Sequence, residues 1–272
     1  MSNHRLGPAL LLSLLFIVSP PALALQPLVS DDTGTQGSGG IQVELAYSAF
    51  RQRLSGSTNR LDSLPFTYTR GVSETLDLFV SASYGRLRPA GSSAVYGAGT
   101  PSIGAKWRFM GTEEDDTRLG VKPEIFFPIN GSAREADGFA AGNTSGRLTF
   151  LLEQKVPFGV VLVNAFVGRN RRHGMFDGSG DSTTTGLSLA PIWEVSGEWR
   201  LALDMGQSYQ RGGGSTTIGR YLEAAAIYSI DKDLELALGI IGASDNQNPR
   251  TTTRPRHSAS PGDSSKHLAV SA

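Results

Sequence analysis

From Gly40 onward, apolar and polar residues alternate with a period of two, and this alternation constrains the fold more than any other feature of the sequence. In residues 41–50, for example, Val43 and Leu45 share one face of an extended chain and Gln42 and Glu44 share the other. A helix would repeat every 3.6 residues instead. The pattern predicts strands over residues 41–50, 64–68, 76–84, 102–109, 118–127, 147–155, 160–168, 186–195, 199–207, 221–230 and 234–241.

Charged residues in these segments all lie on the less apolar face. They are Glu44, Asp77, Lys106, Arg108, Arg118, Lys122, Glu124, Arg147, Glu153, Lys155, Glu194, Arg200, Asp204, Glu223 and Glu235. In a soluble β-sandwich the apolar face would pack on a core. In a transmembrane barrel it would face lipid, with the charges in the lumen. The distribution of charge by itself leaves both folds open.

Connection lengths discriminate between the two folds. Long and short connections alternate along the chain, as in outer-membrane barrels with short periplasmic turns and longer extracellular loops. Most segments also approach the roughly 9 to 11 residues that a tilted strand needs to cross a bilayer. Trp107, Trp193 and Trp199 lie near short connections, and Tyr47 and Tyr84 near long ones, which is typical of two aromatic girdles. We therefore predict an all-β, antiparallel, up-and-down transmembrane β-barrel.

The ends of the chain differ from the alternating region. Residues 1–24 combine a basic start, an apolar run and small residues at Ala22-Leu23-Ala24, which is typical of a secretory signal peptide. We divide the remainder into a periplasmic segment (25–40), the barrel (41–243) and a Pro/Ser/Thr/Arg-rich tail (244–272) expected to be disordered. The expected location is the outer membrane of a Gram-negative cell, reached after signal-peptide cleavage.

Composition excludes several functions. The chain has 25 basic and 25 acidic residues, so bulk charge does not favour nucleic-acid binding. It has no cysteine, which excludes disulfides and thiolate metal sites. We expect no cofactor and no resident metal, because the acidic run 113–116 is typical of a solvated turn. The expected partners are outer-membrane lipids, a small-molecule solute and the barrel-assembly machinery.

Catalytic motifs are few. His173 lies in a predicted loop beside Asp177 and Asp181, and Ser179 and Ser182 are the nearby nucleophiles, without a recognisable spacing. The triplet Asp32-Thr33-Gly34 matches that of aspartic proteases but occurs once. We therefore predict that the protein is not an enzyme, with a hydrolase at the barrel rim as the remote alternative.

The predicted lumen carries basic and acidic residues in similar numbers, whereas strongly ion-selective pores are lined by one sign of charge. Eleven strands is also an odd number, and bacterial barrels use even numbers, so we expect about twelve with an uncertain closing strand. The preferred interpretation is a narrow channel for small solutes, with Pro27 to Gly39 as a periplasmic gate that includes Asp31, Asp32, Gly34 and Gly37. The alternative is a non-conducting barrel whose extracellular loops bind or shield a ligand. The candidate lumen-lining residues are Glu44, Asp77, Lys106, Arg108, Lys122, Glu124, Arg147, Glu153, Arg200, Asp204 and Glu223.

Four stretches resemble one family. Residues 27–37 (PLVSDDTGTQG), 102–109 (SIGAKWRF), 123–131 (PEIFFPING) and 162–168 (LVNAFVG) are similar to blocks of the meta-pathway of phenol degradation family of outer-membrane transporters. The resemblance spans about residues 27–243, and its most specific part is the N-terminal block. It implies a barrel for uptake of small, hydrophobic or aromatic solutes, adds Asn164 to the lumen, and predicts a twelfth strand ending in an aromatic residue, which residues 244–272 do not offer. Thr100-Pro101 stands where the family tends to carry an acidic residue.

Overall fold

The computed structural model describes residues 28–54, 57–129, 143–170 and 181–246, together with the backbone of 265–271. These residues form thirteen strands, and every paired strand is antiparallel to its neighbour. The strands are β1 (Ile41–Leu54), β2 (Ser57–Ser73), β3 (Leu76–Arg88), β4 (Val95–Ala98), β5 (Ser102–Met110), β6 (Thr117–Phe126), β7 (Ser145–Val156), β8 (Gly159–Asn170), β9 (Ser182–Glu194), β10 (Trp199–Gly212), β11 (Ser215–Ser229), β12 (Glu235–Asp245) and β13 (Ser265–Ser271).

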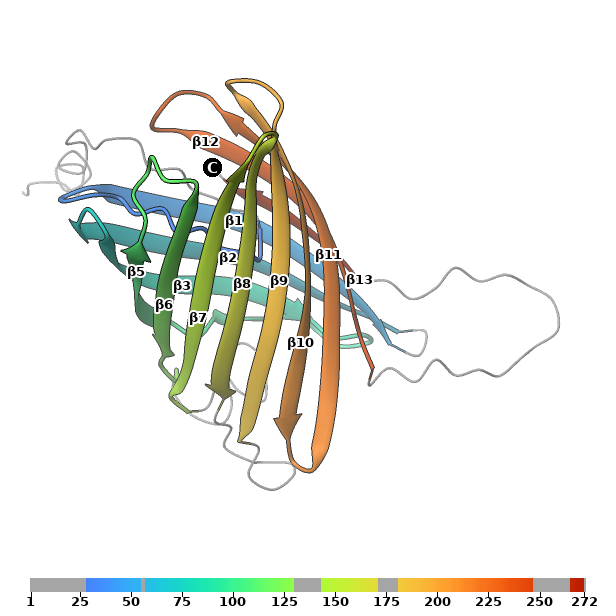
Figure 1. Ribbon diagram of the computed structural model, residues 1–272. Helices are drawn as coiled ribbons and strands as arrows, with labels where there is room; N and C mark the ends of the chain where they lie inside the picture. The colour runs from blue at the N-terminus through green and yellow to red at the C-terminus, as the bar shows by residue number, and fades with distance from the viewer. Residues whose placement is uncertain (1–27, 55–56, 130–142, 171–180, 247–264, 272) are drawn as a thin grey trace, which may run out of the picture.

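The sheet closes on itself. Sequential neighbours pair around the wall, β2 pairs with β3, and β13 lies between β12 and β1 (Figure 1). The short strand β4 pairs with residues 84–87 of β3, and β5 pairs with residues 76–81, so β4 and β5 share one position. Thirteen strands therefore occupy twelve positions, which confirms the predicted barrel. β1 and β12 therefore do not end the sheet as open edges, because β13 pairs with residues 46–51 of β1 and residues 237–243 of β12, and a sheet surrounded by hydrocarbon requires such closure.

Two details differ from the sequence-based expectation. Residues 265–271, expected within a disordered tail, form the closing strand β13, although their sequence carries little alternation. The expected long connections at 51–63 and 209–219 are largely strand. There the strands extend beyond the apolar belt, so their residues are polar and resemble loop. Gly213 (φ +57°) and Gly214 (φ +76°) join β10 to β11 in a tight hairpin, since a two-residue turn with both φ values positive favours glycine.

The wall is apolar outside and polar inside, the reverse of a soluble protein. Leu187, Leu222 and Ile240 are more than half exposed, at 58%, 53% and 57%, whereas Asp77 and Asp204 are buried at 1% and 0%. Within the described residues, no helix has the length and apolar character needed to cross a membrane. Isolated carboxylates are costly to bury, so this arrangement is stable only if apolar solvent covers the outside and polar partners occupy the inside.

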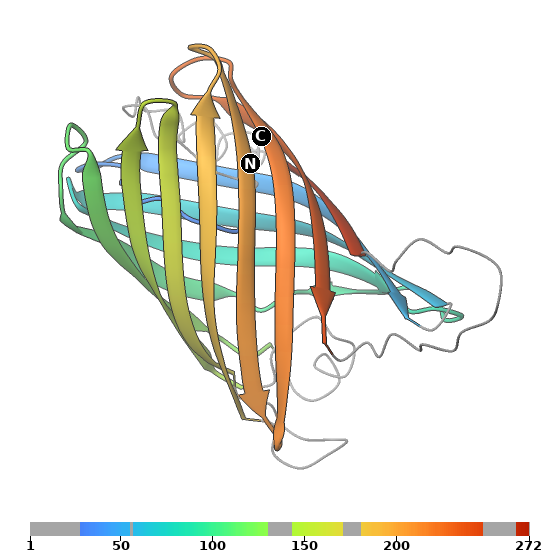
Figure 2. The same ribbon diagram turned by 45° about the vertical axis from the view of Figure 1, so that its right-hand side comes forward.

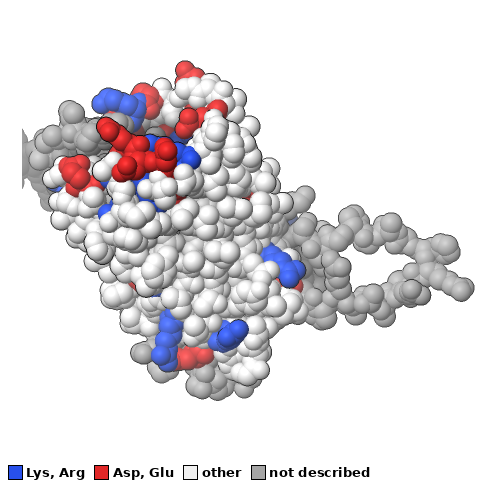
Figure 3. All heavy atoms as spheres, viewed as in Figure 1, with Lys and Arg blue, Asp and Glu red and all other residues white. Residues whose placement is uncertain are grey.

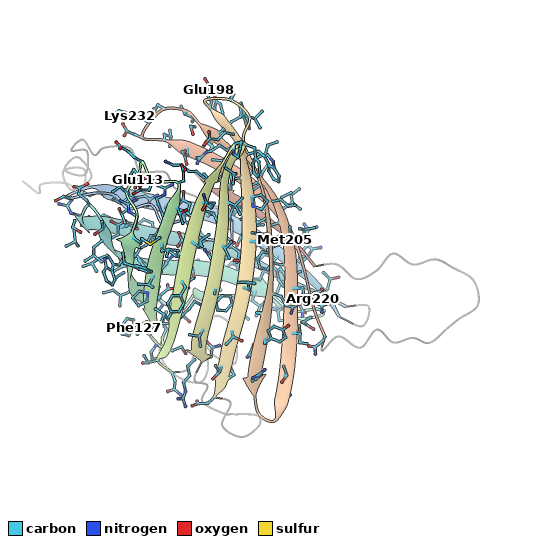
Figure 4. All side chains as sticks on the ribbon, viewed as in Figure 1. Glu113, Phe127, Glu198, Met205, Arg220 and Lys232 are labelled. Atoms are coloured by element: carbon cyan, nitrogen blue, oxygen red, sulfur yellow. The ribbon has the colours of Figure 1, made fainter. Side chains whose placement is uncertain are left out.

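Charge and aromatic residues mark the two ends of the barrel. On the face shown in Figure 3, charged side chains gather toward the ends and leave an uncharged band between them. Figure 4 places Glu113, Glu198 and Lys232 at the end with the short turns and Phe127 at the opposite end. At the short-turn end, Trp199 packs on Tyr228 with ring centroids 4.7 Å apart.

Candidate functional site

The segment Leu28–Gly40, which precedes β1, crosses the interior of the barrel. Ser30, near the start of the segment, is anchored on β9 and β10. The Ser30 amide donates to Oδ2 of Asp204 (2.6 Å), and the Ser30 hydroxyl contacts Oδ1 of Asp204 (2.9 Å) and Oγ of Ser188 (2.7 Å). Ser30 is 1% exposed and Asp204 is fully buried, so this end of the segment is held away from solvent.

Asp31 and Asp32 lie between β5, β6 and β8. Lys106 Nζ is 2.9 Å from Asp31 Oδ1 and 3.0 Å from Asp32 Oδ1, and Lys122 Nζ is 2.5 Å from Asp31 Oδ2. Asn164 forms two hydrogen bonds with the Asp31 backbone: its Oδ1 accepts from the Asp31 amide (2.6 Å) and its Nδ2 donates to the Asp31 carbonyl (2.8 Å). These contacts hold both the carboxylates and the backbone of the segment against β5, β6 and β8.

The rest of the segment follows β7 and β3. Glu153 Oε2 accepts hydrogen bonds from the amide (3.1 Å) and the hydroxyl (2.7 Å) of Thr33. The Gln36 amide donates to both carboxylate oxygens of Asp77, at 3.1 and 3.0 Å. Gly34 donates its amide to Asp32 Oδ1 (2.9 Å), which closes a local turn. Wall carboxylates thus serve as acceptors for the segment's backbone donors.

The segment meets the wall's backbone at Gly71. The Gly39 amide donates to the Gly71 carbonyl (3.0 Å), and the Gly71 amide donates to the Gly40 carbonyl (2.9 Å). A Cβ atom at Gly71 would lie 1.7 Å from the carbonyl oxygen of Gly37, so only glycine permits this close approach. Gly37 belongs to the turn that leads into β1, since its carbonyl accepts from the Gly40 amide (3.1 Å).

An apolar cluster fills one side of the interior. Leu28 packs against inward residues of β8 to β11, namely Leu162, Ala190, Ile192, Ala202 and Ala225. Leu162 and Ala190 are at most 1% exposed. The start of the segment is therefore held against β8 to β11 by apolar contacts.

The opposite side contains a polar cavity of about 150 Å³. It lies between the segment and strands β1, β2, β3, β5 and β6. Its lining includes Asp31, Asp32, Gln42, Glu44, Thr67, Thr69, Asp77, Phe79, Ser81, Lys106, Lys122 and Glu124. Lys122 Nζ is 4.8 Å from the ring centroid of Phe79, so the cavity offers an aromatic face beside charged groups of both signs.

The two carboxyl groups of the segment differ in their electrostatic environment. Burial raises the pKa of Asp32 to about 6; Asp31 and Glu153 act in the same direction, and Lys106 opposes them. Burial alone would also raise the pKa of Asp31, but the ammonium groups of Lys106 and Lys122 hold it below its usual range. Asp31 contacts two ammonium groups and Asp32 shares one, which explains the opposite directions.

Not every residue predicted for the lumen contacts the segment. Those that do are Asp77, Lys106, Lys122, Glu153, Asn164, Asp204 and Glu223, of which Glu223 is 2% exposed and accepts a hydrogen bond from the Val29 backbone. Glu44 and Glu124 line the cavity. Arg108 instead bonds Glu113 and the Glu74 carbonyl (2.9 Å), and Arg200 pairs with Glu235. Arg147 lies over the rings of Phe126 and Phe166, with centroid distances of 5.8 and 5.1 Å.

The candidate rim site is only partly within the described residues. His173, Asp177 and Ser179 lie outside them. Asp181 pairs with Arg169 (3.1 Å), and the Ser182 hydroxyl accepts from Gln210 (3.1 Å). Glu113 of the acidic run bonds Arg108 and Arg118, and over the described ranges no group of three His, Asp or Glu residues is arranged to hold a metal ion.

Sequence reasoning missed Leu28, Ser30, Thr33 and Gln36 as interior residues, although it singled out the stretch that contains them. It missed Ser188 and Phe79 for a different reason, because uncharged residues on the inward face attract no attention in a search for charge. The inward parity of both residues was the available signal.

Together, these features define a closed outer-membrane type of β-barrel with its own N-terminal segment across the lumen. No family model and no curated protein matches the chain. Among solved structures, an outer membrane channel from Pseudomonas putida F1 is 12% identical, with 88% of this chain and 97% of that one covered at a TM-score of 0.58. The porin NanC is 8% identical (85% and 98% covered, TM-score 0.53), and the β domain of the Bordetella autotransporter BrkA is 12% identical (86% and 98%, TM-score 0.50). These likenesses establish the fold.

Proposed function

We propose that the protein is an outer-membrane channel for small solutes and that residues 28–40 are its gate. The observation that carries the proposal is the path of this segment, which crosses the lumen beside a polar cavity of about 150 Å³. With the segment in place the lumen is narrow. With the segment displaced, the twelve-position wall encloses a wider passage lined by Asp77, Lys106, Lys122, Glu153 and Asp204.

The way the segment is held supports a gate rather than a permanent plug. Side chains of the wall supply most of its contacts, and its backbone pairs with the wall backbone at Gly71 alone among the described residues. Displacing it therefore breaks no strand pairing in the barrel. When the segment leaves, water hydrates the wall carboxylates and ammonium groups that had contacted it, because the lumen is polar on that side.

Conductance in planar bilayers tests the proposal. A variant that lacks residues 25–39 should show a larger and steadier conductance than the full chain. Equal conductance of the two proteins would contradict the proposal that the segment is a gate. An absence of current in both proteins would contradict the channel proposal and favour the non-conducting barrel.

A reversible lock gives a sharper test. The Ser30 and Ser188 hydroxyl oxygens are 2.7 Å apart, and the chain has no native cysteine, so Ser30→Cys/Ser188→Cys needs only a small shift to form a disulfide. Oxidation should hold the channel in its low-conductance state, and reduction should release it. Each single cysteine variant is the matched control and should not respond to oxidant. Identical conductance of the oxidised and reduced double variant would contradict the gate.

We propose further that the chain belongs to the meta-pathway of phenol degradation family, and that its solutes include small aromatic acids. The N-terminal block that carries the resemblance is the segment that crosses the lumen, which gives the block a physical role. Phe79 beside Lys122 offers a ring contact and a cation within the cavity. Liposome swelling with aromatic acids, sugars and amino acids of similar size tests the preference. Equal rates for all three classes would leave a channel without aromatic preference.

A further inference from the structure

Three arginines form a row on the outside of the barrel, across three neighbouring strands. The register pairs Arg51 of β1 with Arg60 of β2, and Arg60 with Arg88 of β3. Directly opposed residues in an antiparallel sheet project from the same face. Here that face is the outer one, because Tyr47 and Tyr84, which have the same parity on β1 and β3, are 45% and 57% exposed.

The row lies just beyond the apolar belt. On β1 the outward positions run through Val43, Leu45 and Tyr47 before they reach Arg51. On β3 they run through Leu78, Val80 and Tyr84 before Arg86 and Arg88. This end of β1 to β3 lies at the end of the barrel that carries the long connections from β6 to β7 and from β8 to β9, whereas β2–β3 and β7–β8 are joined by short turns at the other end (Figure 2). Longer connections mark the extracellular end of an outer-membrane barrel. The row consequently stands at the level of the headgroups of the outer leaflet.

The row lacks a counter-charge from the protein. Over the described ranges, no carboxylate forms an ion pair with any of its three arginines. Asp62 is the acidic residue nearest to the row on the outer face of β2; it lies opposite Arg86, and its Oδ1 accepts a hydrogen bond from the Tyr47 hydroxyl (3.2 Å). Like charges directly opposite one another destabilise a strand pair, so an external anion would relieve a repulsion built into the sheet.

We propose that the row Arg51–Arg60–Arg88 binds the phosphate groups of the phosphorylated glycolipid of the outer leaflet, lipid A. Guanidinium groups bind phosphate through two parallel hydrogen bonds, and three in line span more than one phosphate. The same strands offer exposed apolar side chains, among them Leu64 and Phe66, on the membrane side of Asp62. An amphiphile with phosphates above acyl chains therefore matches the surface at both levels, and a free phosphate ion matches only one.

The test measures binding of diphosphorylated lipid A to the full chain folded in a neutral detergent, by native mass spectrometry. The variants are Arg60→Gln, at the centre of the row, and the triple Arg51→Gln/Arg60→Gln/Arg88→Gln. Arg211→Gln is the matched control, because Arg211 lies on the outer face at the same end of β10, with Thr183 and Thr216 as its register neighbours. Dephosphorylated lipid A and inorganic phosphate are the comparison ligands.

We expect the apparent Kd to rise about tenfold for Arg60→Gln and further for the triple variant, as the loss of charge-assisted contacts predicts. Arg211→Gln should stay within about twofold of the wild type. Dephosphorylated lipid A should bind the wild type weakly, and equimolar inorganic phosphate should not displace lipid A. Unchanged affinity in Arg60→Gln, equal binding of dephosphorylated lipid A, or displacement by equimolar phosphate would each overturn the proposal. If the triple variant does not fold, Arg60→Gln decides the question.

Discussion

Closure of the lumen by residues 28–40 should strengthen as the pH falls from 7 to 5, and Asp32 should be responsible. Burial raises the pKa of Asp32 from 3.8 to about 6 in the docked segment. A group whose pKa is raised binds its proton more tightly when docked, so its contribution to docking is complete below pH 3.8 and is lost as the pH rises through about 6. Asp31 behaves oppositely: its pKa lies below the usual range, so its contribution is lost only in stronger acid and is constant between pH 5 and 7.

The magnitude follows from the two pKa values of Asp32. A shift of about two units corresponds to about 3 kcal/mol across its full range. The interval from pH 7 to pH 5 covers only the upper part of the pH range over which Asp32 titrates, so only part of this free energy is gained there. The ratio of closed to open channels should therefore rise about tenfold. Asp32 is 6% exposed, so solvent screening reduces this effect little.

Single-channel recordings at pH 5, 6 and 7 measure the ratio directly. Asp32→Asn resembles the protonated carboxyl group and does not titrate. The variant should therefore be more closed than the wild type at pH 7, equal to it at pH 5, and flat between them. A heat-modifiable gel shift at each pH shows whether the barrel itself stays folded. The reasoning is refuted if acid opens the wild-type channel, or if Asp32→Asn keeps the tenfold change.

Three further predictions concern the wall. Gly71→Ala should release the segment and raise conductance without unfolding the barrel. Gly146→Ala is the control, because its added Cβ would lie 3.7 Å from the nearest atom, and it should leave conductance unchanged. A wild-type conductance in Gly71→Ala would contradict the close approach of Gly71 to Gly37. Deleting residues 265–272 should abolish the heat-modifiable shift, because β1 and β12 would lose their shared partner, and a folded band would show that closure does not need β13. Gly214→Val should lower the free energy of unfolding by about 1–2 kcal/mol, measured in urea, because its φ of +76° disfavours a β-branched residue; unchanged stability would argue against the turn geometry.

Period-two alternation predicted eleven of the thirteen strands, and the asymmetry of the connections indicated that they form a barrel. Lipid contacts one face of every strand and the lumen the other, so outward positions must be apolar and inward positions can be polar. Each of the eleven predicted segments overlaps an observed strand, with an excess of at most one residue at an end. The signal fades where the strands leave the lipid. This explains why the polar ends of β1 and β2 resembled loops, and why β4 and β13, which are short, were not recognised.

The contents of the lumen could not be predicted in the same way. Residues 28–40 have no periodicity, because each of them meets a different strand rather than one repeating surface. Leu162 and Ile192 face inward although they are apolar, because their neighbour inside the barrel is Leu28 and not water.

The wall and the segment are held in place by different kinds of interaction, and this difference allows the segment to move while the wall stays folded. The wall depends on a continuous ladder of backbone hydrogen bonds, which membrane hydrocarbon makes costly to break. The segment depends on a few side-chain contacts at the lumen, such as Lys106 with Asp31 and Asp204 with Ser30, for which water is a ready substitute. Proton release from Asp32, or a change of one glycine, is therefore sufficient to loosen the segment while the barrel around it remains intact.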